Sequence, residues 1–471
     1  MKDSFGRIFI CFCLLLFLGM GNLFSQIRWD SVPGRFQNPD AANVMYADSN
    51  YMYVGGPFTE VGGKPMKAIA RWNGVKWDSM GAGIDGLDTG NQYGLGNIGA
   101  ITTFQNKIYV GGAFFSLGHT NIRAIGTWDG TKWDSLPIQP IGQLEYDGIA
   151  TLAVINNKLY IGGYFDTVAG FPCTGIASWD GTGWNRLNFP SNFSFNGIGS
   201  ICEYKGSIYA AGYFNGENGS VGDILRLDSV GWHSVDTGVK GTGWVSSMVV
   251  YNGELYIAGY FSTSDRNADN NIQRWDGTTW NAVGGGTDDE IWNLIVYNGK
   301  LYAMGQFETA GGISASGIAE WDGNKWCSLG STFDNTIGTS CIYKDSLYIG
   351  GGFWTIDGDS ISYLAEWVGG NYVANCGQPT GVSEVKDNTE KVSVYPNPNN
   401  GNFTLVIASV TKQSLNTVEI YNVLGEKIYQ SNIYSDNSEI NLTGQPNGIY
   451  LYRVITETGE LVGQGKVVVQ R

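Results

Sequence analysis

Residues 53–59 read Tyr-Val-Gly-Gly-Pro-Phe-Thr and residues 69–74 read Ile-Ala-Arg-Trp-Asn-Gly, and this pair of stretches recurs along most of the chain. In each copy about ten variable residues separate the Gly-x-Phe segment from a Trp-Asp-Gly-type turn, and a second aromatic residue follows the turn. Seven copies are visible, and their first anchors are Tyr53, Tyr109, Tyr160, Tyr209, Tyr256, Tyr302 and Tyr348. A unit that recurs at a nearly regular spacing, as these anchors do, indicates structural units that stack on one another.

Each copy predicts four short strands. In the fourth copy, residues 198–204 form the first strand and residues 207–212 the second. The third strand ends at the Trp of the turn, and the fourth carries the second aromatic residue. The Asp-Gly of the turn favours a tight hairpin, because Gly tolerates the positive φ that such turns require. One four-stranded sheet cannot bury both faces alone, so we expect an all-β, seven-bladed β-propeller over residues 26–376.

Two segments compete for the last strand of the seventh copy. Residues 27–32, Ile-Arg-Trp-Asp-Ser-Val, match the fourth strand of other copies, such as Lys-Trp-Asp-Ser-Met at residues 76–80. The seventh copy also has its own candidate at residues 371–374, where Tyr372 would follow Trp367. We favour the N-terminal segment, because a strand from the other end of the chain would close the ring.

The repeat unit resembles the kelch-type β-propeller repeat, in which an apolar strand also ends in Gly-Gly and a Trp lies in the fourth strand. It is most similar to bacterial relatives of that repeat, and the resemblance covers residues 27–376. The short Trp-Asp-Gly turn departs from the kelch pattern, so the resemblance implies the fold and not the functions of kelch proteins.

The N-terminal residues predict export. Lys2 and Arg7 precede an apolar run at residues 8–18, and polar or small residues follow. This order is typical of a secretory signal peptide, which we place at residues 1–25. No other stretch is apolar enough for a transmembrane anchor. We therefore expect a secreted or outer-surface protein after signal-peptide cleavage.

Charge and cysteine content exclude several classes of function. The chain has 28 Lys and Arg against 43 Asp and Glu, so binding to nucleic acid is excluded. Five cysteines remain after cleavage, and an odd number leaves at least one free thiol or an intermolecular pair. No Cys or His cluster with zinc spacing is present. Only His119 and His233 could serve a His-dependent nucleophile, and both lie at positions expected to face solvent.

The C-terminal part has a different residue pattern and lacks the repeat. Residues 377–390 are polar and predict a linker, and residues 391–471 alternate short β-rich runs with Gly, Asn and Pro. This pattern predicts a small, Ig-like β-sandwich. Its distinctive residues occur in a Tyr-Pro-Asn-Pro opening, at a strand end, in a hairpin and in the last strand: Tyr395, Pro396, Asn397, Pro398, Gly425, Gly448, Tyr450 and Lys466.

In that order, these motifs resemble the C-terminal sorting domain of the type IX secretion system of Bacteroidetes. The resemblance implies that residues 391–471 engage the type IX machinery, are cleaved, and leave the rest of the chain attached to the cell surface or released. A carbohydrate-binding sandwich is the alternative for this segment.

Candidate ligand-binding residues occur where each first strand begins, near the mouth of the expected channel. They are Asp40, Asp147, Asn196, Trp244, Asp289, Trp292 and Asn335. Side-chain oxygens together with aromatic faces suit sugar hydroxyls or a divalent cation such as calcium. The alternative is that the Asp and Asn residues only shape the turn into the strand. Ligands of a metal cannot be assigned from this pattern, and we expect no other cofactor.

The sequence therefore favours a non-catalytic, monomeric propeller that binds a glycan or a protein at the cell surface. Glycoside hydrolases need two carboxylates within about 5–10 Å, so an alternative is a polysaccharide-active hydrolase or lyase on the same scaffold. A third reading is a structural adhesin whose loops contact protein partners. No catalytic residue is assigned.

Overall fold

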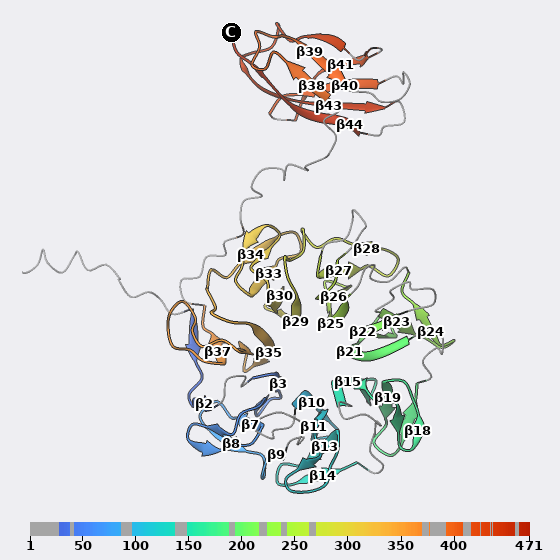
Figure 1. The fold of residues 1–471 in the computed structure, drawn as a ribbon, viewed down its shortest axis with the longest axis vertical. Coiled ribbons are helices and arrows are strands. Elements are labelled where there is room, and N and C mark those ends of the chain that lie inside the picture. The colour runs from blue at the N-terminus through green and yellow to red at the C-terminus, as the bar shows by residue number, and fades with distance from the viewer. Residues whose placement is uncertain are drawn as a thin grey trace, which may run out of the picture. The chain divides into compact units, whose positions relative to one another are not determined.

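The computed structural model describes residues 28–37, 42–85, 97–136, 148–187, 194–215, 224–236, 243–262, 270–369, 376, 392–407, 416–423, 425–433, 435, 437–456 and 461–471. All secondary structure elements in these ranges are β-strands, and the chain divides into two compact units, residues 1–377 and 378–471 (Figure 1). The predicted signal peptide, the linker at residues 377–390 and the candidate strand at residues 371–374 lie outside the described residues. No described helix is long and apolar enough to cross a membrane.

The described part of the first unit contains seven four-stranded antiparallel sheets, numbered here in chain order. Sheet 1 has β3 (Val44–Ala47), β4 (Met52–Gly55), β7 (Ile69–Trp72) and β8 (Trp77–Ser79). Sheet 2 has β10 (Asn97–Phe104), β11 (Lys107–Ala113), β13 (Ile125–Trp128) and β14 (Trp133–Ser135). Sheet 3 has β15 (Gly148–Ile155), β16 (Lys158–Tyr164), β19 (Ile176–Trp179) and β20 (Trp184–Arg186). Sheet 4 has β21 (Ser194–Tyr204), β22 (Ser207–Asn215), β23 (Ile224–Leu227) and β24 (Trp232–Ser234).

The remaining sheets follow the same plan. Sheet 5 has β25 (Trp244–Tyr251), β26 (Glu254–Tyr260), β27 (Ile272–Trp275) and β28 (Trp280–Asn281). Sheet 6 has β29 (Ile291–Tyr297), β30 (Lys300–Gly305), β33 (Ile318–Trp321) and β34 (Trp326–Ser328). Sheet 7 has β35 (Ile337–Tyr343), β36 (Ser346–Gly351), β37 (Leu364–Trp367) and the N-terminal β1 (Trp29–Ser31). Four strands per repeat, as predicted, are confirmed.

Short strands in the loops add small ribbons to this framework. They are β2 (Phe36–Gln37), β5 (Glu60–Val61) and β6 (Lys64–Pro65) in one ribbon, β9 (Ile84–Asp85) with β12 (Ser116–Leu117), β17 (Thr167–Val168) with β18 (Phe171–Pro172), and β31 (Thr309–Ala310) with β32 (Ile313–Ser314).

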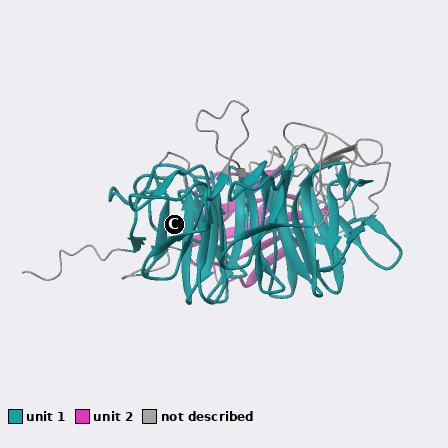
Figure 2. Ribbon diagram, turned by 90° about the horizontal axis from the view of Figure 1, so that it is seen from below, with its two compact units in different colours: residues 1–377 teal, residues 378–471 magenta. Residues whose placement is uncertain are grey.

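The sheets lie around a common centre, with the first strand of each sheet innermost and β3 beside β35 (Figure 1). Seen edge-on, their strands run alongside one another through the thickness of the unit (Figure 2). The last sheet takes its outer strand from the N-terminus, because β1 pairs antiparallel with β37 and Trp29 lies opposite Trp367. This pairing confirms the prediction that the N-terminal segment completes the seventh repeat.

Most sheets contain an aromatic pair on their two outer strands, and the indole of the outer Trp bonds to the preceding sheet. Trp72–Trp77 and Trp321–Trp326 pack with ring centroids 5.2 and 5.3 Å apart, and Trp29 with Trp367 repeats this pair at 4.8 Å in sheet 7. The indole of the outer Trp donates to the carbonyl that follows the preceding sheet: Trp133 Nε1 to Met80 O at 2.9 Å and Trp77 Nε1 to Pro33 O at 2.6 Å. Pro33 follows β1, so the same bond joins sheet 7 to sheet 1.

Two further ties recur between neighbouring sheets, including the last and the first. The Tyr297 hydroxyl in sheet 6 donates to Asp345 O in sheet 7 at 3.1 Å, and the Tyr343 hydroxyl in sheet 7 donates to Asn50 O in sheet 1 at 2.9 Å. Lys205 donates to Asp276 O at 2.6 Å, and Lys344 donates to Asn73 O at 2.9 Å. The junction between sheets 7 and 1 is therefore built like the others.

The second unit is a two-sheet sandwich, as predicted. One sheet orders β38 (Val392–Tyr395), β39 (Asn402–Ile407) and β42 (Asn437–Asn441). The other orders β41 (Lys427–Ile433), β40 (Asn416–Tyr421), β43 (Gly448–Thr456) and β44 (Leu461–Val469). Leu405 and Ile440 from the first sheet and Val418 and Val454 from the second belong to one buried cluster. The sandwich thus has its own hydrophobic core.

Candidate functional site

Four half-exposed aromatic residues surround a hollow at one end of sheets 3–5. Tyr164, Tyr213, Trp244 and Tyr260 are 50, 41, 40 and 47% exposed, and with Gly243 they line a cavity of about 550 Å³. We call this cavity the aromatic hollow. Its volume lies in the range of small-ligand sites, about 300–1,000 Å³. Large aromatic residues gathered on a surface mark a binding site more often than single ones do.

The repeat explains why the three tyrosines meet. Each is the residue after the Gly near the end of the second strand, and the other sheets carry Pro57, Ala113, Gln306 and Gly352 at this position. In strand register, Tyr164 lies opposite Gly148 and Tyr213 opposite Gly197. A Cβ atom on Gly197 would lie 2.5 Å from the Tyr164 ring, so the glycine lets the ring of one sheet lie flat on the backbone of the next.

Trp244 closes the hollow from the innermost strand of sheet 5. It lies opposite Tyr260, and the two rings are 5.2 Å apart between centroids with an interplanar angle of 34°. Its indole Nε1 donates to Glu290 Oε1 at 2.7 Å, in the loop that enters sheet 6. The bond fixes the ring plane, so the aromatic surface is pre-organised rather than free to rotate.

A second cavity, of about 390 Å³, lies at the same end of sheets 6 and 7. We call it the acidic hollow, since four of its lining residues are carboxylates. Its lining residues are Asp288, Asp289, Gly305, Gln306, Phe307, Glu308, Ser316, Gly317, Phe333, Asp334, Asn335 and Thr336. The predicted residues Asp289 and Asn335 are therefore brought into one cavity.

Most of the acidic side chains in this hollow accept hydrogen bonds from backbone N–H groups. Asp289 Oδ1 accepts from Glu290 N and Asn335 Oδ1 from Thr336 N, both at 2.8 Å. Asp288 Oδ1 accepts from Thr309 N at 2.7 Å, and Asp334 Oδ1 accepts from Trp354 N at 2.8 Å. These bonds agree with the alternative that such residues shape the entry into the strand.

Burial would raise the pKa of Asp334, yet the backbone N–H groups of Thr355 and Trp354 outweigh it and hold the pKa of this carboxyl below its usual range. Asp334 is therefore ionised at neutral pH.

The other predicted residues have different positions. Trp292 occupies the β-bulge of β29, where its ring lies 3.6 Å from the place of a Cβ on Gly338, at the corresponding bulge of β35. The equivalent bulge residues Gly99, Ala150, Gly199 and Ser246 are small. Asn196 lies in β21, and its side chain is outside the described residues, as are Asp40 and Asp147 altogether.

Four residues of the site were missed from the sequence: Tyr164, Tyr213, Tyr260 and Glu290. A signal existed for the tyrosines, because Gly-Tyr-Phe occurs at residues 163–165, 212–214 and 259–261, in three consecutive repeats. Glu290 follows Asp289 directly and carried no such pattern. The residues predicted from the sequence lie at the same end of the sheets as these tyrosines, but the sequence pattern did not distinguish the tyrosine position from a structural one.

The two histidines lie in different sheets and face solvent. His119 is exposed in the loop after β12, and His233 is exposed in β24, with a ring nitrogen 3.2 Å from Asp228 Oδ1. Arg71 and Arg274 also lie in different sheets, and Arg274 is bound to Glu254 at 2.6 Å. Among the described residues, the two histidines and the two arginines therefore do not come together in one site.

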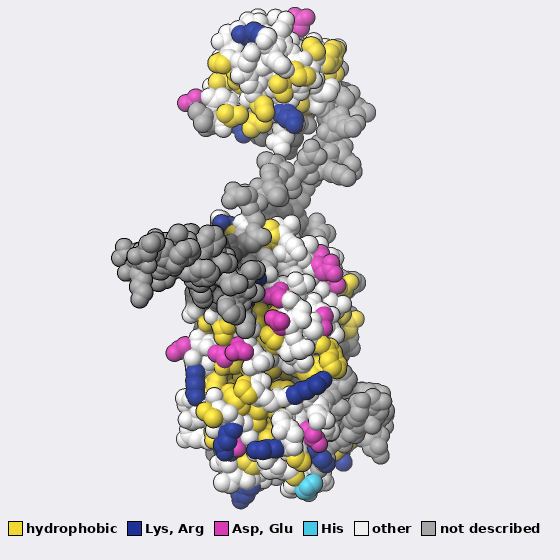
Figure 3. Space-filling view, turned by 90° about the vertical axis from the view of Figure 1, so that its left-hand side faces the viewer, with side chains coloured by type: hydrophobic (Ala, Val, Ile, Leu, Met, Phe, Trp, Pro, Cys, Tyr) yellow, Lys and Arg dark blue, Asp and Glu magenta, His cyan; other side chains and the backbone are white. Residues whose placement is uncertain are grey.

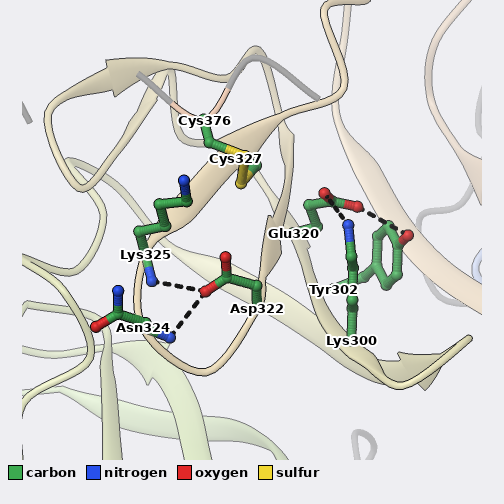
Figure 4. The surroundings of a disulfide bond; sticks show 8 residues. All are labelled: Lys300, Tyr302, Glu320, Asp322, Asn324, Lys325, Cys327 and Cys376. Carbon is green, nitrogen blue, oxygen red and sulfur yellow. Dashed lines mark hydrogen bonds and ion pairs between the residues drawn. A yellow bond between two sulfur atoms is a disulfide. The ribbon is translucent and has the colours of Figure 1, made fainter. Parts of the chain in front are cut away.

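A disulfide joins Cys327 in β34 to Cys376, beside a buried ionic cluster (Figure 4). Glu320, 1% exposed, binds Lys300 Nζ at 2.5 Å and the Tyr302 hydroxyl at 3.0 Å. In the described part of the chain, Glu320 and these two cysteines are the one group of potential ligands within 4.8 Å of each other. Both thiols are used by the disulfide, so the group is structural.

The three other described cysteines are unpaired. Cys341 is buried, and Cys173 and Cys202 are half-buried. Burial raises the pKa of the Cys173 thiol to about 12 and of the Cys202 thiol to about 11, aided by the charges of Asp166 and Glu203. Such thiols are poor nucleophiles, because the thiolate is the reactive form.

In the second unit the predicted motif residues converge on β44. The Asn397 side chain donates from Nδ2 to Lys466 O at 2.9 Å and accepts from Val468 N at 2.8 Å, as a neighbouring strand would. Pro396 and Pro398 both follow cis peptide bonds. The Tyr450 hydroxyl donates to Pro446 O at 2.7 Å in the hairpin that begins at Gly448.

Tyr395 is 56% exposed, and Lys466 is also exposed. Gly425 has a φ of 81° at the turn between β40 and β41. Pro396, Asn397 and Pro398 are exposed as well, whereas Tyr450 is buried, so most of the motif side chains lie at the surface of the sandwich.

Residues 393–470 match the family described as the secretion system C-terminal sorting domain. This domain indicates export by type IX secretion and interaction with that machinery, so the protein is secreted or displayed at the cell surface. No curated protein matches the chain significantly.

Three solved structures are similar to the chain at low identity. PorZ, a surface component of the type IX secretion system of Porphyromonas gingivalis, is 12% identical with a TM-score of 0.41, over 94% of this chain and 61% of PorZ. The extracellular domain of BT4673 from B. thetaiotaomicron is 12% identical with a TM-score of 0.44, over 94% and 59%. A fungal alcohol oxidase of the AA5 family, in complex with copper, is 11% identical with a TM-score of 0.37, over 94% and 100%. The chain thus spans about three fifths of the first two proteins.

Proposed function

We propose that the first unit is a closed, seven-bladed, kelch-like β-propeller that binds a glycan in the aromatic hollow without turning it over. The observation that carries this proposal is the set of four half-exposed aromatic rings around one cavity of about 550 Å³. A pyranose presents C–H groups on one face and hydroxyls at its edge. Aromatic rings with a polar tip suit such a ligand, because they offer an apolar face and a hydrogen-bonding group together.

Ring closure is supported by the contacts at the junction of sheets 7 and 1. Besides the β1–β37 pairing, Met45 N in sheet 1 donates to Thr339 Oγ1 in sheet 7 at 3.0 Å, and Met248 N donates to Ser200 Oγ between sheets 5 and 4 at 3.1 Å. Met52 of sheet 1 and Leu364 of sheet 7 share one buried cluster. In a closed ring each sheet packs between two others, and only short, protected sheet edges remain.

A binding role is favoured over catalysis by the chemistry of the hollow. Its lining is aromatic, and Glu290, which contacts this lining, is bound to the Trp244 indole. Three of the four acidic residues of the neighbouring cavity accept backbone hydrogen bonds. General acid–base catalysis needs a group free to reach the substrate proton. On the side of the first unit in Figure 3, acidic and basic side chains are interspersed, which suits neither a polyanion nor a membrane surface.

The test of glycan binding uses residues 26–471 in affinity electrophoresis through gels containing hydroxyethyl cellulose, arabinoxylan, galactomannan or laminarin. Release of reducing ends is measured in the same samples. We expect retardation by at least one polymer and no product. Trp244→Ala and Tyr213→Ala should weaken retardation about tenfold, as expected for central aromatic anchors. Phe171→Ala is the matched control, because Phe171 is 57% exposed on β18, outside the hollow.

Absence of retardation by every polymer, or equal retardation of the Trp244→Ala variant, would refute the proposed site. Product release that survives Trp244→Ala and disappears with Asp289→Ala would instead favour the polysaccharide-active enzyme. Export is tested separately by deleting residues 391–471, which should trap the protein in the periplasm. Unchanged surface display would contradict the sorting role of that segment.

A further inference from the structure

The aromatic hollow and the acidic hollow are joined by one residue. Glu290 accepts the Trp244 indole N–H at 2.7 Å on the aromatic side. On the other side its backbone carbonyl accepts from Gln306 N at 3.0 Å, and it directly follows Asp289; both of these neighbours line the acidic hollow. A second bond, from Ser246 Oγ to Ile291 O at 2.6 Å, ties the same strands together. The two cavities are therefore neighbours along one mouth.

Charge is distributed unevenly between the two cavities. Asp288, Asp289, Glu308 and Asp334 line one of them, and Glu290 stands between them. Among the described lining residues of both cavities there is no Lys or Arg. A ligand that extends from the aromatic rings past Glu290 thus meets four carboxylates and, among the described lining residues, no positive charge.

We propose that the two hollows form one elongated site that accepts uncharged or amine-bearing glycans and rejects glycans with carboxylate or sulfate groups. This inference rests on the proposed glycan-binding function and adds the charge class of the ligand. Like charges brought close together in a partly desolvated cleft repel one another strongly, whereas carboxylates accept hydrogen bonds from hydroxyl and ammonium groups. Protonated amines gain a further attraction from the faces of Trp and Tyr rings.

The experiment compares three charge classes with the full mature chain. Hydroxyethyl cellulose and galactomannan are the neutral probes, chitosan at mildly acidic pH is the cationic probe, and alginate, polygalacturonate and chondroitin sulfate are the anionic probes. We expect the neutral and cationic polymers to bind at least about tenfold more tightly than the anionic ones at low ionic strength. The gap should narrow at high salt, because screening weakens the repulsion.

Charge-neutralising variants separate this inference from the proposed function. Glu290→Gln keeps an oxygen for the Trp244 indole, and Asp289→Asn keeps an acceptor for Glu290 N. The double variant should bind anionic polymers at least about threefold better and chitosan worse, so that the gap in affinity between the charge classes narrows. Asp134→Asn is the control for each single variant, because Asp134 lies exposed in β14 and this substitution removes one negative charge outside both hollows.

Each outcome has a distinct meaning. Binding of anionic polymers as tight as that of neutral ones overturns the inference but leaves the glycan-binding function standing. A double variant with an unchanged gap between the classes also overturns it, because the discrimination would then arise elsewhere. Failure of every polymer to bind overturns the proposed function and this inference together.

Discussion

Sheets 3–5 and sheets 6–7 are built from the same repeat but present different surfaces at the same end. After the Gly of the second strand, sheets 3–5 carry Tyr164, Tyr213 and Tyr260, whereas sheets 6 and 7 carry Gln306 and Gly352. Their backbones are alike, since every innermost strand from β10 onward has a bulge at its start. The residue at this position therefore decides whether an arc of the mouth carries an aromatic ring. The charge of the other arc comes from the carboxylates in its loops, Asp288, Asp289, Glu308 and Asp334.

The two arcs also differ in what fixes them. In sheets 6 and 7, Asp288 and Asp334 each accept two backbone N–H groups from the loop after the second strand of the same sheet. Sheet 7 contains the N-terminal strand, and the disulfide at Cys376 brackets its other three strands. This arc is stabilised by contacts between segments distant in sequence, while the aromatic arc comes from consecutive repeats. The proposed binding site and the proposed ring closure thus rest on different arcs, and variants in each arc should affect one property only.

The largest effect is expected for Trp29→Ala in the closing arc. Trp29 is 1% exposed, packs against Phe333 and Trp367, and donates from Nε1 to Ser331 Oγ at 3.1 Å. Replacing a buried Trp with Ala leaves a large cavity and should lower the free energy of unfolding by about 3–5 kcal/mol. Urea denaturation followed by Trp fluorescence measures this loss. Trp244→Ala, which removes a 40% exposed ring, should change it by less than about 1 kcal/mol.

If Trp29→Ala and Trp244→Ala destabilised the protein equally, the proposed difference between the arc of sheets 6 and 7 and the aromatic arc would be wrong. Loss of glycan retardation in a folded Trp29→Ala protein would also contradict this difference, because it would show that the two arcs are not independent.

A smaller effect should follow from Cys376→Ser. The disulfide spans a sequence separation of 49 residues, which encloses β35, β36 and β37. Cross-links of this length stabilise by about 2–4 kcal/mol, chiefly by restricting the unfolded chain. We expect a loss in that range for Cys376→Ser, with unchanged glycan affinity. Dithiothreitol should destabilise the wild type to the same extent and leave the variant unaffected; a further loss in the reduced variant would mean that the reductant acts elsewhere.

Graded losses of affinity should distinguish the tyrosines of the aromatic arc. Tyr260 stacks on Trp244 with centroids 5.2 Å apart, whereas Tyr164 lies over the backbone at Gly197. Tyr260→Ala removes a contact face and the support of a second ring, so it should cost about 1–2 kcal/mol of binding free energy. Tyr164→Ala should cost less. Calorimetric titration with the tightest polymer measures both, and a reversed order would place the centre of the site nearer to sheet 3.

The fold could be predicted from the sequence because recurring residues of the repeat mark where its strands end. Gly-x-Phe ends the second strand, Trp precedes the hairpin, and the match between residues 27–32 and residues 76–80 predicted the pairing of β1 with β37. These signals are local, since backbone conformation and a buried ring recur in every copy. The disulfide was not predictable, because Cys376 meets Cys327 only through the tertiary path of the chain.

The site was predicted in part for a related reason. Trp244, Asp289 and Asn335 were assigned to the mouth from their position before each first strand, and they do line its two cavities. The contact of Tyr164 with Gly197 joins different repeats, and pattern matching within one repeat cannot detect it. The Asp and Asn side chains could not be separated into turn-forming and ligand-facing groups, because both roles use the same residue types at the same position.

The smallest expected effect concerns the hairpin aspartates outside both arcs. Asp180 Oδ1 accepts from Thr182 N and Gly183 N, both at 2.8 Å, and these bonds with the Thr182 hydroxyl lower its pKa to about 2. A carboxyl whose pKa is lowered by folding stabilises the protein above its unfolded pKa, near 4, and loses that contribution as the pH falls toward 2. Sheet 1 carries Asn73 in this turn, and its Oδ1 accepts from Val75 N and Lys76 N at 2.9 Å. Asp180→Asn keeps an acceptor for the turn but lacks the charge, so it should slightly lower stability at neutral pH and reduce the decline in stability between about pH 4 and pH 2. Urea denaturation across that range measures the slope, and an unchanged slope would show that the charge of Asp180 contributes nothing to the hairpin.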